Sequence, residues 1–229
     1  MLFQEQNSKP QVISYRHIRR AVGIIGIALP VVLYLVYWLI NQDCKHPPSI
    51  SHYFYTGMST YFTGTLCAVA LFMYCYKGYD KPDNIATNLA AVFALGVALS
   101  PCNIADKSTD IVTFCYVFRL PVNCVRNTIH YASATFLFVD FAIISLFLFT
   151  KNGIGKLPTP NKRVRNKIYR ICGIIIIVSI VLIALADFVT PFGNLVHPKF
   201  PLWTFFFEMM SLFAFGTSWL VKGETIFRD

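Results

Sequence analysis

The 19 residues from 171 to 189 read ICGIIIIVSIVLIALADFV and carry a single charge, Asp187, near the end of the run. A helix rises 1.5 Å per residue and the hydrocarbon core of a bilayer is about 30 Å thick, so about 20 apolar residues cross it. A run of this length and composition predicts a membrane-spanning helix. Four comparable runs precede it and one follows it.

The chain as a whole has the same apolar character. Of its 229 residues, 55% are hydrophobic and only 14% are charged, against about 25% charged residues in soluble domains. We predict an all-α polytopic membrane protein, a bundle of six transmembrane helices that forms a single transmembrane domain over residues 1–229. The expected spans are residues 21–40, 53–76, 85–102, 129–149, 171–189 and 202–221. The run Ile111–Val122 is too short to span, and we expect it in a loop at the membrane interface.

The first span has an alternative interpretation, because basic residues followed by an apolar run also describe a signal peptide. Its length exceeds that of a typical signal-peptide core, and residues 41–45 offer no small-residue cleavage site. We therefore expect a retained span. Pro30 in its middle is compatible with a membrane helix, because neighbouring helices can satisfy the freed carbonyl group.

The basic residues predict the orientation. Lys and Arg outnumber Asp and Glu by 20 to 11, which gives a formal charge of +9. Cytoplasmic loops are enriched in Lys and Arg, and with both termini cytoplasmic 15 of the 20 basic residues lie inside. The charge then indicates orientation in the cell membrane and not a nucleic-acid partner, since the basic run Lys156–Arg170 contains only Tyr169 as an aromatic residue. Anionic membrane lipids are the expected partners of this run.

Four of the five histidines fall on the predicted outer side. Of these, His52, His130 and His197 lie near the outer ends of three spans, so a compact bundle can bring them together. Zinc favours histidine nitrogen, and a catalytic zinc site needs three protein ligands and an open position. No two histidines have a local metal-ligand spacing, so each helix would contribute one ligand. The alternative is that these are interfacial histidines hydrogen-bonded to loops or headgroups.

Two acids lie inside the predicted spans, where a charge costs at least about 2.5 kcal/mol on insertion scales. Asp140 lies near the middle of the fourth span, and Glu208 lies within two turns of the outer end of the sixth. One interpretation is a polar cavity that opens outward, with Glu208 as a base, a proton carrier or a partner of His130 or His197. The other is an acid that joins helices, as Asp140 would by bonding to Ser59, Thr63 or Asn88. Asp187 is expected to be a boundary residue.

The segment before the second span, CKHPPSISHY at residues 44–53, concentrates hydroxyl, imidazole and phenol groups. Ser49 or Ser51 beside His52 can supply a serine–histidine pair, although serines and prolines also make an ordinary turn and helix cap. Four cysteines lie on the predicted outer side and allow three pairings in an oxidising compartment. They are Cys44, Cys102, Cys115 and Cys124.

The layout resembles the six-span family of damage-regulated autophagy modulators and Sfk-type proteins, and is also similar to small uncharacterised bacterial membrane proteins of this length. The matching motifs are Ile50-Ser51 with Thr56-Gly57, His130 in IHYASA and Glu208 in FFEMM, within about residues 44–221. Where the family has an acid after the serine, this chain has His52. The resemblance implies a membrane protein of lipid handling or regulation.

A weaker resemblance is to the ceramidase and progestin-receptor superfamily of membrane zinc hydrolases, which uses a serine, an aspartate and three histidines. Ser49 or Ser51 with His52, His130 and His197 is similar to that inventory. The paired histidines on the last helix of that family are absent, because only His197 lies near the sixth span.

These observations lead to one expected function and two alternatives. We expect a polar site near the outer leaflet that binds a lipid or other amphiphile. The first alternative is a zinc-dependent hydrolase of a lipid amide or ester, and the second is a proton-coupled transporter using Asp140 and Glu208. The expected ligand-binding residues are His52, His130, Glu208, Asp140 and the aromatic wall Phe205–Phe207. The hydrolase would use Glu208, Asp187 and Ser51 as catalytic residues, with His52, His130 and His197 on the metal.

Overall fold

The computed structural model describes residues 8–42, 45–78, 80–100, 102, 124–151 and 159–225. Every regular element in this part of the chain is helical, as the sequence predicts. The predicted interface loop at residues 111–122 lies outside the described residues. The elements are α1 (Ser8–Ile40), η1 (Ile50–Tyr55), α2 (Ser59–Cys75), α3 (Lys81–Leu99), α4 (Cys124–Ile143), η2 (Ile144–Leu148), α5 (Pro160–Phe188), α6 (Thr190–Val196) and α7 (Trp203–Lys222).

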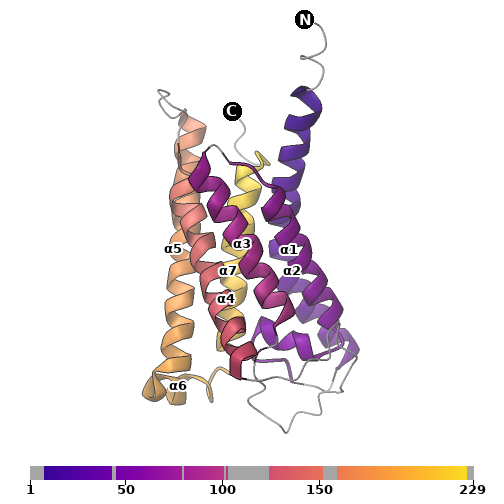
Figure 1. The fold of residues 1–229 in the computed structure, drawn as a ribbon. Coiled ribbons are helices and arrows are strands. Elements are labelled where there is room, and N and C mark those ends of the chain that lie inside the picture. Colours follow the sequence, from indigo (N-terminus) through magenta and orange to yellow (C-terminus); the bar gives the residue numbers. More distant parts are fainter. Residues whose placement is uncertain are drawn as a thin grey trace, which may run out of the picture.

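The long helices run side by side along one axis, and α7 is seen between α1 and α5 (Figure 1). It packs against α1 on one side and α5 on the other, while α2, α3 and α4 pack in chain order. In the most apolar stretch of α7 half of the residues are buried, against 28% in α1 and α5. α7 is therefore the most buried of the long helices, and α1 and α5 are its main neighbours.

Close contact between α1 and α7 depends on two glycines. A Cβ atom on Gly216 would lie 2.6 Å from the carbonyl oxygen of Gly23, and one on Gly23 would lie 2.7 Å from the carbonyl oxygen of Gly216. Small residues allow helix backbones to approach in membranes, where hydrophobic burial does not distinguish a neighbouring helix from lipid.

Five helices are long and apolar enough to cross a membrane, namely α1, α3, α5, α7 and α4 with its π-helical continuation η2. The predicted second span, residues 53–76, is the exception, because its first turn belongs to η1 and α2 has only 17 residues. At 1.5 Å per residue α2 is about 25 Å long. A break precedes α2 because the Thr56 hydroxyl donates to the carbonyl of Tyr53 and accepts from the Met58 N–H.

Other boundaries also differ from the prediction. α1 begins at Ser8, thirteen residues before the predicted first span, and α4 begins at Cys124, five residues before the predicted fourth. α5 begins at Pro160, eleven residues before the predicted span, because Thr159 caps it and the basic run continues the helix. The short helix α6 was not predicted; it begins at Thr190 with a proline in its first turn.

The bundle has two chemically distinct ends. At the first, which we call the basic end, α1 begins and α7 finishes (Figure 1). Arg16 pairs there with Glu224 at 2.9 Å, and Arg20 Nε donates to the carbonyl of Gly223. The other end carries η1 and α6, and we call it the η1 end.

Candidate functional site

Ser49 and His52 form the first part of the candidate site at the η1 end. Ser49 caps η1, and its Oγ accepts from the backbone N–H of His52. The same oxygen lies 2.5 Å from Nδ1 of the His52 ring. Ser49 and Ser51 are both buried, and of these two candidates Ser49 contacts the imidazole. The serine that caps η1 therefore also forms a serine–histidine pair with His52.

Glu208 attaches η1 to α7. Its Oε2 accepts a hydrogen bond of 2.6 Å from the backbone N–H of Ile50. A second bond, from the N–H of Phe205 to the carbonyl of Pro48, joins the same two segments. The first turns of α7 thus hold the segment before α2 in place. Glu208 supplies the hydrogen-bond acceptor that the backbone N–H of Ile50 requires.

His130 is buried on α4, with 2% of its surface exposed, and its Nδ1 donates to the carbonyl of Ser100 at 2.6 Å. A carbonyl oxygen only accepts, so the neutral ring carries its proton on Nδ1 and leaves Nε2 as an acceptor. His52 and His130, both predicted at this end of the bundle, lie within electrostatic range of each other.

Cys102, which follows α3, packs into the same end. The hydroxyl of Tyr55 donates to its carbonyl oxygen, and the thiol is free. Burial and the nearby charge of Glu208 raise the pKa of Cys102 to about 12, so the thiol stays protonated at neutral pH. A disulfide at Cys102, one of the predicted pairings, is not formed; Cys44, Cys115 and the side chain of Cys124 lie outside the described residues.

A cluster of aromatic side chains, which the sequence pattern did not predict, lies next to the site. The ring of His46 stacks on Tyr34 at 3.9 Å, and its Nδ1 lies 3.1 Å from the Tyr53 hydroxyl. Phe205, predicted as part of an aromatic wall, packs against Tyr34 and Tyr53. Burial raises the pKa of Tyr53 and lowers that of His46. The signal that was available is the spacing Tyr34-x-x-Tyr37, which places both phenols on one face of α1.

The depressed pKa of His46 predicts a pH dependence. Above the ordinary histidine pKa of about 6.5 the ring is neutral in both folded and unfolded chains, and its contacts stabilise the fold fully. Below that pH the unfolded chain binds the proton first, so this stabilisation is lost as the pH falls. We expect the melting temperature of the wild type to exceed that of His46→Phe at pH 7.5 and the difference to shrink by pH 5.5. A difference that stays constant over this range would contradict the assignment.

The predicted zinc ligands are not assembled. His197 lies beside Asp187, with Nε2 3.5 Å from Oδ1, and close to the carbonyl of Ala186 at 3.3 Å. Among the residues that the structure describes, no three His, Cys, Asp or Glu side chains form a group that could hold a metal. His52, His130 and His197 do not form such a group, because α6 directs His197 toward the end of α5.

The remaining predicted residues divide between this site and the middle of the bundle. The charge of Asp187 acts on Glu208, so these two predicted catalytic acids are within electrostatic range. Asp140 lies ten residues beyond His130 on α4, about 15 Å deeper. Its Oδ2 and the Thr63 hydroxyl are both buried without a hydrogen-bond partner, so the predicted contact between them is absent.

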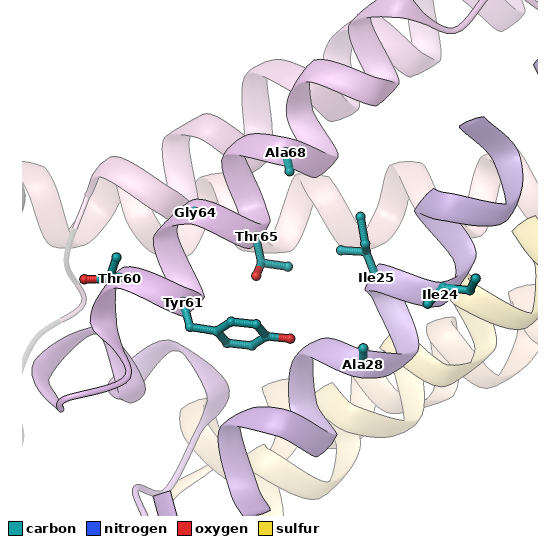
Figure 2. A pocket seen from close by; sticks show the side chains of 8 residues that line it. All are labelled: Ile24, Ile25, Ala28, Thr60, Tyr61, Gly64, Thr65 and Ala68. Atoms are coloured by element: carbon teal, nitrogen blue, oxygen red, sulfur yellow. The ribbon is translucent and has the colours of Figure 1, made fainter. Parts of the chain in front are cut away.

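A groove lies between α1 and α2 on the flank of the bundle (Figure 2). It has a volume of about 360 Å³, within the range of small-molecule sites. Tyr61 reaches from α2 toward Ala28 of α1. Beside Gly64 the space is open, since a Cβ atom there would meet nothing within 4 Å. The lining residues are Ile24, Ile25, Ala28, Thr60, Tyr61, Gly64, Thr65 and Ala68.

No protein-family model, curated protein or solved structure matches this chain. Its function therefore has to be argued from the polar group at the η1 end and the groove between α1 and α2.

Proposed function

We propose that this chain is a six-span protein of the cell membrane, with α2 as the sixth crossing and both termini in the cytoplasm. α1 begins at the basic end and α7 finishes there, which requires an even number of crossings (Figure 1). α2 is 17 residues long, and its mean apolar character matches that of the longer helices. The positive charge at the basic end favours the cytoplasmic side for that end. The η1 end is then extracytoplasmic.

We further propose that the protein binds a membrane lipid whose polar headgroup lies near η1 and whose hydrocarbon chain enters the groove. The groove carries this proposal. It extends from Thr60 to Ala68, about 12 Å along α2, so its volume of about 360 Å³ gives a mean cross-section of about 30 Å². That admits a single hydrocarbon chain but not a helix, which is about 10–12 Å in diameter.

Its rim is continuous with the lipid-facing surface of the bundle. Ile24 is 58% exposed, and Thr60 and Gly64 are exposed as well. Gly64 costs a helix about 1 kcal/mol relative to alanine, and no packing partner requires a glycine there. η1 leads into α2 within four residues, so a headgroup beside Ser49, His52 and Glu208 and a chain beside Tyr61 belong to one amphiphile.

The test fills the groove without touching the polar group. Purified full-length protein in phosphatidylcholine nanodiscs is irradiated with a clickable phosphatidylethanolamine that has a diazirine in its acyl chain. We expect peptides of α1 and α2 to be labelled, and Gly64→Trp to reduce this labelling at least tenfold, because an indole occupies the open space. The matched control is Val92→Trp, which adds the same bulk at an exposed position of α3. Equal labelling in the two variants would refute the groove as a lipid site.

The two alternative functions have less support. A metal-dependent hydrolase lacks an assembled ligand set in the described part of the chain. For proton-coupled transport, the two acids lie at different depths, and Asp140 has no hydrogen bond on Oδ2 to continue a proton path.

A further inference from the structure

A second polar group lies at the basic end, which is the end of the bundle opposite to η1. It is centred on Lys222. Lys222 and Arg165 are nearly buried, with 8% and 7% of their surfaces exposed. The charges of Lys162, Arg19 and Arg165 all act on Lys222, together with that of Asp83. Three basic side chains from α1 and α5 and the carboxylate of Asp83 on α3 thus lie within electrostatic range of Lys222.

That carboxylate also has another partner. Lys151 Nζ lies 2.6 Å from Asp83 and 2.8 Å from Asp80. The group therefore combines five basic side chains with two carboxylates, an excess of three positive charges counted over these seven residues alone. Basic side chains thus outnumber carboxylates around the buried Lys222 and Arg165, which favours an anion in this group.

Two buried donors in the same place have no acceptor. The indole Nε1–H of Trp219, a side chain with no exposed surface, has no hydrogen-bond partner, and neither has Nε of Arg19. Both flank Tyr76, since the Arg19 guanidinium lies 5.4 Å from its ring and Trp219 packs edge-on at 5.1 Å. Buried donors are nearly always paired, and an orphan indicates a missing water or ion.

Lys222 completes the arrangement through Phe149. Its Nζ lies 5.2 Å from the centre of the Phe149 ring, and that ring packs at 5.1 Å against Trp219. The orphan indole donor, the orphan guanidinium donor and a buried ammonium are therefore held around the same aromatic group. Charged and neutral N–H donors of this kind match the oxygens of a phosphate.

We infer that Lys222, Arg19 and Trp219 form a phosphate-binding site at the basic end. Arg165 and Lys162 lie within electrostatic range of Lys222. The phosphate belongs either to a lipid headgroup that enters from the membrane interface or to a free inorganic anion. This site is separate from the proposed lipid site at the η1 end, so either one stands if the other fails.

The experiment measures the melting temperature of the full chain in nanodiscs. In one arm inorganic phosphate is added to phosphatidylcholine nanodiscs, with chloride at the same ionic strength as the reference. In the other arm phosphatidic acid is included in the bilayer. At a ligand concentration of about 100 Kd we expect a rise of roughly 5–10 °C. A rise with both ligands assigns a small-anion site, and a rise with phosphatidic acid alone assigns a headgroup site.

Variants separate this site from a general charge effect. Lys222→Met removes a buried charge, and Arg170→Met removes the same charge from an exposed position of α5. We expect the first to abolish the rise and the second to retain it. Trp219→Phe and Arg19→Lys remove the orphan donors while keeping the ring and the charge, and each should weaken phosphate binding several-fold even if Lys222→Met fails to fold. The inference is overturned if neither ligand exceeds chloride, if Lys222→Met responds like Arg170→Met, or if both donor variants respond like the wild type.

Discussion

Replacing Glu208 with leucine is expected to lower the free energy of unfolding by about 2–3 kcal/mol and to detach η1 from α7. The side-chain oxygen accepts the N–H of Ile50 at 2.6 Å, and a buried donor left without its acceptor costs about 1–3 kcal/mol. Leucine has a similar size but accepts no hydrogen bond, so a buried N–H loses its partner. Thermal or denaturant unfolding in detergent measures the loss, and faster thiol labelling of Cys102 reports the detachment, because that buried thiol lies beneath η1.

Glu208→Gln is the matched control. The amide oxygen can still accept from Ile50, so we expect stability close to that of the wild type, while the negative charge of the site is lost. A ligand that depends on that charge would then bind the glutamine variant weakly although η1 remains attached. If Glu208→Leu is as stable as Glu208→Gln and Cys102 stays protected, the bond to Ile50 does not hold η1 in place.

Gly216→Leu is expected to have the second large effect, because it prevents α1 and α7 from approaching. The first side-chain carbon alone would lie 2.6 Å from both the carbonyl oxygen of Gly23 and Cγ1 of Ile27. Overpacking typically costs 1–3 kcal/mol, and a clash with backbone cannot be relieved by a rotamer change. We expect a loss at the upper end of this range or a failure to fold, visible as a lower melting temperature and reduced monodisperse yield.

Gly64→Ala tests whether this effect is specific to the helix contact. It introduces a Cβ into open space on α2, so the variant should gain up to about 1 kcal/mol from helix propensity. Gly216→Leu behaving like Gly64→Ala would mean that α1 and α7 do not pack through their glycines in the membrane.

Much of the fold follows from the apolar runs. Residues 171–189 lie in α5, and the predicted first, third, fourth and sixth spans also coincide with long helices. The second span was less accurate, since the hydroxyls of Ser49 and Thr56 close a separate turn before α2. Hydropathy does not detect this break, because residues on both sides of it are apolar and buried.

The site was predictable only in part. Counting residues to the helix ends places His52, His130 and Glu208 at one end of the bundle, and the structure brings them there. Hydropathy does not say that Glu208 would bond to Ile50, that Ser49 would contact His52, or that His46 would stack on Tyr34. These contacts join residues up to 158 positions apart, and they depend on how the helices are rotated about their axes.

The sequence by itself determined that this protein is a helical membrane protein, and it determined which of its residues are too polar to face lipid. The reason is that the bilayer requires every backbone group to be bonded within its helix, so apolar length alone predicts a span. Only the tertiary structure decided the partners of those polar residues. It separated His197 from His52 and His130, and it left open space beside Gly64. It also gathered Arg19, Trp219 and Lys222 at one end. Such groupings depend on close packing between helices, and hydropathy does not predict how helices pack.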